Sequence, residues 1–421
     1  MNRDIDVAVV GGGAAGLAAA IKAYENGMKV TIFEWADELG GILPQCVHPG
    51  FGLAYFKEDL TGPEYIERFI DEVENYGIQT MTNSMIVQIK ENNSDNSKKL
   101  VVCGPDTGLI EAKSKAVILT TGCRERARYN LNLPGDRVAG VFTAGTAQRF
   151  MDIEGFMPGK EVVVLGSGDV GMIMARRFAQ EGAKVKGVYE LMPFPGGLTR
   201  NVVQCLEDYN IPLHLSHTVT RINGRKRVES VNLARVDKKF NPIPGTEKEV
   251  KCDTLILSVG LIPDCRLPKI LPADMGIELD ENTNGPIVNE LLETSQSLTF
   301  AAGNFLMVND MVDDVTLQGE MAGKFAADII KNGYPSVRWK PTIPGDGIRF
   351  VVPHKVSGLR DVTFYMRVEK PMENVHIEIP EIDRKIFRTV VRPPEMVKID
   401  LSAEDIKKVD KLTFQIQTKS R

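Results

Sequence analysis

The sequence lacks closely spaced cysteines. Its six cysteines are Cys46, Cys103, Cys123, Cys205, Cys252 and Cys265, and no two of them form a C-x-x-C pair. The usual spacings of zinc and iron–sulfur ligands are therefore missing, and a dithiol that relays electrons within the chain is not expected. Most of these thiols should be buried as small apolar side chains. His214 and His217 lie on a predicted strand, where an i, i+3 pair points to opposite faces, so no metal site is expected there.

Excess positive charge and long apolar runs are also missing. The formal net charge of −5 argues against a nucleic-acid partner. No apolar run is long enough to span a bilayer. The apolar start, residues 7–20, is interrupted by glycines and preceded by Asp4 and Asp6, unlike a signal peptide. The 421 residues, 43% hydrophobic and 25% charged, predict a soluble cytoplasmic protein of about two to four domains.

A glycine-rich turn with the spacing G-x-G-x-x-G occurs twice, each time between an apolar strand and a helical run. The glycines are Gly11, Gly13 and Gly16 in the first turn and Gly166, Gly168 and Gly171 in the second. In such turns the first glycine permits the tight bend and the second leaves room for a pyrophosphate. The third lets the helix pack close to the strand. The helix N-terminus then presents its N–H groups to the phosphates.

A glutamate follows each turn where an acid that binds ribose belongs. Glu34 stands 18 residues after Gly16, and Glu190 stands 19 residues after Gly171. A carboxylate accepts hydrogen bonds from ribose hydroxyls and repels a 2′-phosphate, so Glu190 favours NAD(H) over NADP(H). The alternatives are a plain tight turn between packed elements and a solvated acid at the end of a strand.

The duplication continues beyond the turns. Each unit closes with a buried strand that runs into a glycine, residues 116–121 before Gly122 and residues 254–259 before Gly260. We therefore predict an α/β fold with two Rossmann-like dinucleotide-binding domains, the second inserted in the first. Two dinucleotide sites in one chain indicate a flavoprotein that also uses a nicotinamide. The expected FAD-binding domain is discontinuous, over residues 1–125 and 261–335, and the NAD-binding domain covers residues 126–260.

Later segments complete the predicted fold. A helix is expected from about Leu317 to Lys331, with its N-terminal dipole directed at a flavin or simply covering the sheet. From Pro341 onwards, apolar residues alternate with period two between prolines and polar turns. This pattern predicts a small all-β, sandwich-like module over residues 340–421. Docking or dimerisation is its expected role, and plain packing is the alternative.

The sequence resembles the flavoprotein disulfide reductase superfamily with two dinucleotide domains. The matching motifs span residues 5–335 in the expected order: residues 9–16, 120–122, 166–171, 258–260 and 300–304. More narrowly, the stretch from residues 122–126 through 144–150 is similar to a subgroup of bacterial oxidoreductases associated with glycerol-3-phosphate dehydrogenase flavoproteins. Subunits of opine, sarcosine and cyanide-forming amine oxidases are more distant relatives. The resemblance implies FAD at the first site and NAD(H) at the second.

The motifs and the resemblance together give the expected site residues. For FAD they are Gly11, Gly13, Ala14, Ala15, Gly16, Glu34, Gly41, Thr121, Gly122, Gly303 and Asn304. For NAD(H) they are Gly166, Gly168, Asp169, Val170, Gly171, Glu190 and Gly260.

Two departures from the superfamily matter. Asn304 stands where relatives often carry an aspartate that reaches the ribityl chain of FAD. The redox-active cysteine pair is missing from both places where relatives have it. Cys46 is the remaining candidate catalytic residue, because a thiolate near a helix start or near His48 could react with peroxide or contact the flavin. A passive small side chain beside the flavin is the alternative.

The expected reaction follows from these features. NADH delivers hydride to FAD, and the electrons leave for a partner because no internal dithiol exists. The resemblance suggests a partner flavoprotein dehydrogenase, with a small iron–sulfur or cysteine-rich subunit, in a homo- or hetero-oligomer, and the flow can run in either direction. Three alternatives stay open: a free-standing NADH oxidase or peroxidase that uses Cys46, a subunit of an opine or amine oxidase, and a non-catalytic redox-sensing or scaffold flavoprotein.

Overall fold

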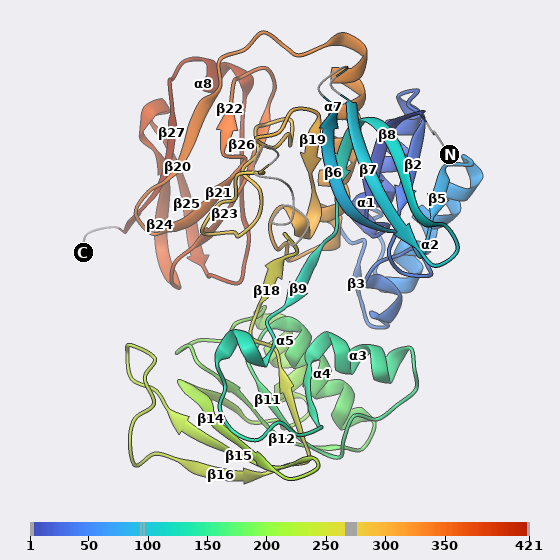
Figure 1. The fold of residues 1–421 in the computed structure, drawn as a ribbon. Helices are drawn as coiled ribbons and strands as arrows, with labels where there is room; N and C mark the ends of the chain where they lie inside the picture. The colour runs from blue at the N-terminus through green and yellow to red at the C-terminus, as the bar shows by residue number, and fades with distance from the viewer. Residues whose placement is uncertain (1–3, 93–94, 96, 266–275, 419–421) are drawn as a thin grey trace. The chain divides into compact units, whose positions relative to one another are not determined.

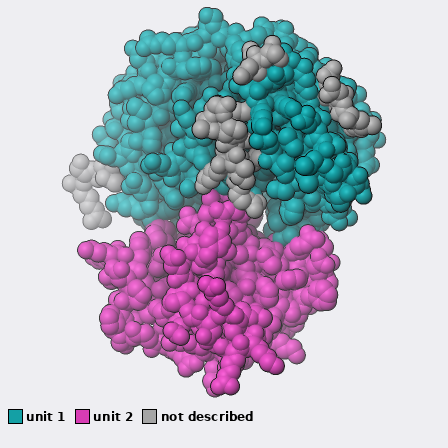
Figure 2. Space-filling view, in the orientation of Figure 1, with its two compact units in different colours: residues 1–123, 263–421 teal, residues 124–262 magenta. Residues whose placement is uncertain are grey.

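The computed structural model describes residues 4–92, 95, 97–265 and 276–418. The chain divides into two compact units, coloured separately in Figure 2. Unit 1 comprises residues 1–123 and 263–421, and unit 2 comprises residues 124–262. The predicted domain ranges include residues 266–275 and 419–421, which lie outside the described part.

Unit 1 contains a seven-stranded sheet with the order β5-β2-β1-β8-β7-β6 and with β19 paired to β8 (Figure 1). Its strands are β1 (Asp4–Val10), β2 (Val30–Phe33), β5 (Gln79–Met81), β6 (Met85–Asn92), β7 (Ser97–Gly104), β8 (Gly108–Leu119) and β19 (Thr299–Ala301). Strands β5, β2, β1, β8 and β19 are parallel, whereas β6, β7 and the first half of β8 form an antiparallel meander. Among the parallel strands, β1 and β2 are nearly continuous apolar runs, as is usual for strands covered by helices.

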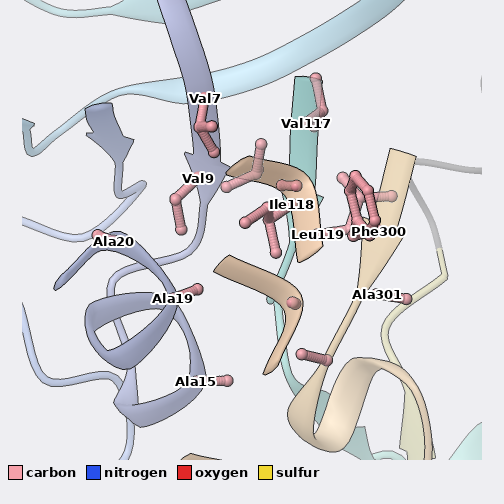
Figure 3. Packing of buried hydrophobic residues seen from close by; sticks show 14 of the residues in the cluster. Val7, Val9, Ala15, Ala19, Ala20, Val117, Ile118, Leu119, Phe300 and Ala301 are labelled. Carbon is pink, nitrogen blue, oxygen red and sulfur yellow. The ribbon is translucent and has the colours of Figure 1, made fainter. Parts of the chain in front are cut away.

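Among the described residues, three helices belong to this part of unit 1: α1 (Ala14–Glu25), α2 (Gly62–Asn75) and α7 (Val312–Asn332). Helix α7 packs very closely on α1, since a Cβ atom at Gly319 or Gly323 would lie 2.2 Å from the carbonyl oxygen of Ala15 or Ala19. Figure 3 shows side chains of α1, β1, β8 and β19 gathered in the resulting core. Helix α2 begins with a capping box, in which the Thr61 hydroxyl accepts the Glu64 N–H and the Glu64 carboxylate accepts the Thr61 N–H.

Unit 2 repeats this plan. Its sheet has five parallel strands, in the order β10 (Val141–Thr143), β17 (Thr254–Leu257), β11 (Glu161–Leu165), β12 (Lys184–Glu190) and β13 (Leu213–Leu215). Helices α3 (Ala144–Asp152) and α4 (Asp169–Gln180) pack on it, and an antiparallel sheet follows, of β14 (His217–Gly224), β15 (Val228–Arg235) and β16 (Lys248–Lys251). In both units the strand that precedes the glycine turn is central in its sheet. Strand β1 lies between β2 and β8, and β11 lies between β12 and β17. The predicted α/β fold with Rossmann-like dinucleotide-binding domains is confirmed.

Residues 340–418 belong to unit 1 but have an apolar cluster of their own. One sheet has the order β22 (Lys355–Val356), β20 (Lys340–Pro344), β27 (Leu412–Thr418), β24 (Met372–Ile379) and β25 (Arg384–Val391). The other contains β21 (Ile348–Val352), β23 (Val362–Val368) and β26 (Val397–Leu401). The segment is not purely β, because it includes the short helix α8 (Ala403–Lys407) and a 3-10 turn (Pro380–Ile382).

The remaining elements are short. They are β3 (Pro49–Phe51), β4 (Leu60–Thr61), β9 (Cys123–Glu125), β18 (Leu261–Pro263), α5 (Thr199–Asn201), a π-helix (Val202–Glu207) and 3-10 turns at Leu43–Gln45, Arg128–Leu131 and Gly303–Phe305. Among the helices of the described residues, none combines the length and apolarity needed to cross a membrane. The described residues also hold no group of three or more side chains that could bind a metal ion.

Candidate dinucleotide-binding sites

In the first glycine turn, the surrounding backbone leaves no room for a side chain at two of the three glycines. Gly11 has a φ of +108°, and a Cβ atom there would lie 2.5 Å from the carbonyl oxygen of Thr120. A Cβ atom at Gly16 would lie 1.8 Å from the carbonyl oxygen of Gly11. The Thr120 hydroxyl donates to the carbonyl oxygens of Val10 (2.9 Å) and Gly11 (3.0 Å), which fixes the bend at the end of β8.

Gly13 is different, because the protein itself does not require a glycine there. Its φ of −84° suits any residue, and the nearest atom to an added Cβ would be the Cα of Gly41, at 3.7 Å. Gly13 caps α1 without a side-chain hydrogen bond, and the first turn of α1 holds no acid. A bare backbone strip in front of an uncapped helix N-terminus fits a pyrophosphate group.

Glu34 lies at the rim of this turn with only 4% of its surface exposed. Its carboxylate accepts the N–H groups of Gly12 (2.6 Å) and Ala36 (2.9 Å). Its backbone is held by the end of β5, since its N–H donates to the Met81 carbonyl (2.9 Å) and its carbonyl accepts the Ser84 N–H (2.8 Å). The carboxylate therefore has a fixed position beside Gly12 and keeps lone pairs that can accept ribose hydroxyls.

The second turn repeats the geometry of the first. Gly166 has a φ of +96°, and a Cβ atom there would lie 2.1 Å from the Ser258 carbonyl oxygen. A Cβ atom at Gly171 would lie 2.5 Å from the Cβ of Ser258. Gly168 caps α4 without a side-chain hydrogen bond, and Val170 in the first turn packs against the core of the unit.

Glu190 makes the same contacts as Glu34. Its carboxylate accepts the N–H of Ser167 (2.8 Å), between the first two glycines, and the N–H of Met192 (2.9 Å), two residues after the acid. The Ser167 hydroxyl adds a third hydrogen bond at 2.7 Å. The duplication seen in the sequence therefore extends to individual hydrogen bonds. Ser167, like Gly12, was not singled out from the sequence, although its place between the two glycines is the signal.

Residues 5–322 match the pyridine nucleotide-disulphide oxidoreductase family. The chain belongs to this family. This family is described as one of oxidoreductases that use a pyridine nucleotide.

Individual relatives are more distant. The chain is 27% identical over 290 residues to hydrogen cyanide synthase subunit HcnB of Pseudomonas aeruginosa, covering 65% of this chain and 60% of the relative. It is 26% identical over 332 residues to the glutamate synthase [NADPH] small chain of Mycobacterium tuberculosis, covering 71% and 61%. The chain thus spans about three fifths of the length of these curated relatives. Thioredoxin reductase of T. acidophilum is similar in structure, with a TM-score of 0.63 and 27% identity over 78% of this chain and 100% of that one.

The fold brings other predicted residues to the first turn. A Cβ atom at Gly303 would lie 2.8 Å from the Cβ of Ala15, so the Gly303–Asn304 turn lies against the first turn of α1. The Gly303 N–H donates to Gln318 Oε1 (3.0 Å), and Asn304 Oδ1 accepts the Asn309 N–H (2.9 Å). Gln318, fully buried on α7, was missed because its partners are distant in sequence.

Thr121, Gly122 and Gly260 follow the closing strands, as expected. The Thr121 N–H lies beside Gly11, and the Thr121 hydroxyl donates to the Asp264 carbonyl at 3.4 Å. Gly122 and Gly260 have φ values of +70° and +99°, with no atom near the position of a Cβ. Both strands therefore end in left-handed turns that favour glycine.

Two expectations about helix and strand placement are wrong. Helix α7 begins at Val312, not near Leu317, and its first turn holds the buried acids Asp313 and Asp314. Negative charge there offsets the positive end of the dipole that was expected to face the flavin.

The two histidines do not point to opposite faces of one strand. They lie on β13 and β14, because Ser216 between them has a φ of +56° and breaks the strand. The imidazole centroids of His214 and His217 are 5.7 Å apart, and His214 stacks on Tyr189 at 4.7 Å. Burial, His217 and Lys248 together lower the pKa of His214.

Cys46 follows the 3-10 turn at Leu43–Gln45 and is half-buried. Its Sγ lies 3.4 Å from the Ile42 carbonyl oxygen, and the backbone of Cys46 packs against Gly62 at the start of α2. His48 is half-buried, with its ring 5.2 Å from that of Phe51. All six cysteines are within the described residues, and none of them forms a disulfide.

Proposed function

We propose that this protein passes electrons between NAD(H) and a partner redox protein, with FAD in unit 1 and NAD(H) in unit 2. The observation that carries the proposal is the repeated turn, in which Glu34 and Glu190 accept corresponding backbone N–H groups. When bound, the flavin accepts hydride from the nicotinamide and passes electrons on. The protein contributes binding, orientation and the exclusion of water.

The first unit holds FAD through backbone groups. The N–H groups at the start of α1 bind the pyrophosphate over Gly13, and Glu34 accepts the adenosine ribose hydroxyls. The Gly303–Asn304 turn offers the Asn304 side chain to the ribityl chain. The complete proposed set is Gly11, Gly13, Ala14, Ala15, Gly16, Glu34, Gly41, Thr121, Gly122, Gly303 and Asn304.

The second unit holds NAD(H) and prefers it to NADP(H). Glu190 repels a 2′-phosphate, and Arg177 of α4 forms ion pairs with Asp152 (3.0 Å) and Glu181 (2.8 Å). This arginine is therefore not available to bind a 2′-phosphate. The complete proposed set is Gly166, Gly168, Asp169, Val170, Gly171, Glu190 and Gly260.

We propose a partner protein because the redox-active cysteine pair of the superfamily is missing from this chain. Without an internal dithiol, electrons leave the flavin for a second protein. Three relatives are parts of larger enzymes: hydrogen cyanide synthase, glutamate synthase and, at 21% identity over 71% of this chain, the opine oxidase of Agrobacterium tumefaciens. The resemblance of residues 122–150 favours a flavoprotein dehydrogenase of the glycerol-3-phosphate type, with a small iron–sulfur or cysteine-rich subunit.

Anaerobic titration of the purified yellow protein tests this proposal. We expect NADH to bleach the flavin absorbance at lower concentration than NADPH, because Glu190 faces the 2′ position. Bleaching by NADPH alone would refute the NAD(H) assignment, and bleaching by neither would refute hydride transfer in this chain. Reduction of the flavin by glycerol 3-phosphate, but not by amines, in the complex purified with its partner would identify the partner class.

A second candidate function, NADH oxidase or peroxidase activity, rests on the half-buried thiol of Cys46. It predicts fast NADH consumption by the isolated chain with oxygen or peroxide. Cys46→Ser should then abolish turnover while FAD content stays the same. Under the electron-transfer proposal the same variant keeps its rate with an artificial acceptor such as ferricyanide, measured by steady-state NADH oxidation.

A further inference from the structure

Unit 2 contains a counterpart of the glycine pair that flanks the first turn. Gly40 and Gly41 follow Glu34 by six and seven residues, and Gly196 and Gly197 follow Glu190 at the same spacing. In unit 1 the Gly40 N–H donates to the Gly12 carbonyl (2.8 Å), and a Cβ atom at Gly41 would lie 3.0 Å from the Gly13 Cα. This pair lies against the backbone of its turn.

The pair in unit 2 also lies against its turn. The Gly196 N–H donates to the Ser167 hydroxyl at 2.7 Å. A Cβ atom at Gly196 would lie 3.3 Å from a carboxylate oxygen of Glu190, and one at Gly197 would lie 2.8 Å from the backbone nitrogen of Asp169. A Cβ atom at Gly197 would collide with the start of α4, whereas one at Gly196 would make only a tight contact. We call residues 196–201 the strap.

Asp169 holds the strap in this position. It occupies the place of Ala14 in the first unit, directly after the second glycine of the turn. Its Oδ1 accepts the Leu198 N–H (2.8 Å) and the side-chain amide of Asn201 (2.6 Å). Asn201 is itself buried, at 7% exposure, where an unpaired amide would be costly. The carboxylate therefore ties both ends of the Leu198–Asn201 segment to the helix that carries the turn.

We propose that Asp169 is a positioning residue for the nucleoside diphosphate bound by unit 2. It fixes the strap so that Gly196 and Gly197 form the second wall of the pyrophosphate groove, opposite Gly168. The inference rests on the proposed NAD(H) site. The Asp169 side chain acts by holding the strap and not by contacting the dinucleotide directly.

Binding of ADP-ribose, the nicotinamide-free part of NAD(H), tests the proposal by calorimetry on the FAD-loaded protein. Asp169→Ala is expected to weaken binding about tenfold, the loss that follows removal of a charge-assisted hydrogen bond. Asp169→Asn, which keeps an acceptor for the Leu198 N–H, should recover most of the affinity. In steady state the Asp169→Ala variant should raise the KM for NADH by a similar factor and leave kcat unchanged. Glu229→Ala removes an exposed acid of unit 2 and serves as the control.

Asn201→Ala tests the strap in a second way, because it removes the amide that binds Asp169 and keeps the charge of Asp169. It should weaken ADP-ribose binding in the same direction, and it keeps the test open if Asp169→Ala does not fold. Unchanged affinity in both variants would refute the strap role, and tighter binding by Asp169→Ala would show that the carboxylate repels the phosphate instead. If wild-type protein retains FAD but binds no ADP-ribose, the proposed NAD(H) site itself fails.

Discussion

Gly13→Ala is expected to give a folded protein that no longer retains FAD. The φ of Gly13 is allowed for alanine, and the new methyl group would have only ordinary contact with Gly41, 3.7 Å away. The cofactor, however, needs the space above the bare backbone. We expect the Kd for FAD to rise about a hundredfold, or about 3 kcal/mol, measured by quenching of flavin fluorescence on titration of apoprotein.

Gly16→Ala separates this effect from damage to the fold. Its methyl group would lie 1.8 Å from the Gly11 carbonyl oxygen, so the turn itself must move and the variant should unfold at a clearly lower temperature. Gly13→Ala should keep the wild-type apoprotein melting temperature within a few degrees. Normal FAD binding by Gly13→Ala would show that the cofactor lies elsewhere.

The strands around both turns could be predicted because they are continuous apolar runs bounded by glycine. The hydrogen bonds of Glu34 could not, since its backbone position depends on the pairing of β2 with β5, whose residues come about fifty positions later. The start of α7 was missed for a similar reason. Asp313 and Asp314 are typical of exposed turns, yet Asp313 accepts the Tyr55 N–H (2.8 Å) and Asp314 pairs with Lys398.

The C-terminal strands also show which features can and cannot be predicted from the sequence. Strand β26 shows the pattern that sequence can reveal, because its buried apolar residues alternate with exposed ones. Strand β20 does not show this pattern, because two of its five residues are prolines, which usually mark breaks. Strand β25 lies at the edge of its sheet, where nearly every side chain keeps some contact with solvent and no buried face marks the pattern. Periodicity predicts a strand only where one face is buried.

Glu190→Gln is expected to reduce the preference for NADH over NADPH by about ten- to a hundredfold in kcat/KM. Loss of the charge removes the repulsion of a 2′-phosphate and weakens the hydrogen bonds to the NAD ribose, a change of about 1.5–3 kcal/mol. A glutamine oxygen can still accept the Ser167 N–H, but its amide cannot accept the Met192 N–H, so a small loss of stability, about 1 kcal/mol, accompanies the change.

Steady-state rates with both nucleotides and a common acceptor measure this preference. Glu34→Gln is the matched control, because Glu34 has the corresponding contacts in the other unit. It should lower FAD affinity without altering the NADH to NADPH ratio. If the ratio followed Glu34 and not Glu190, the assignment of the two cofactors to the two units would have to be exchanged, since only the acid beside the nicotinamide dinucleotide can sense its 2′ substituent.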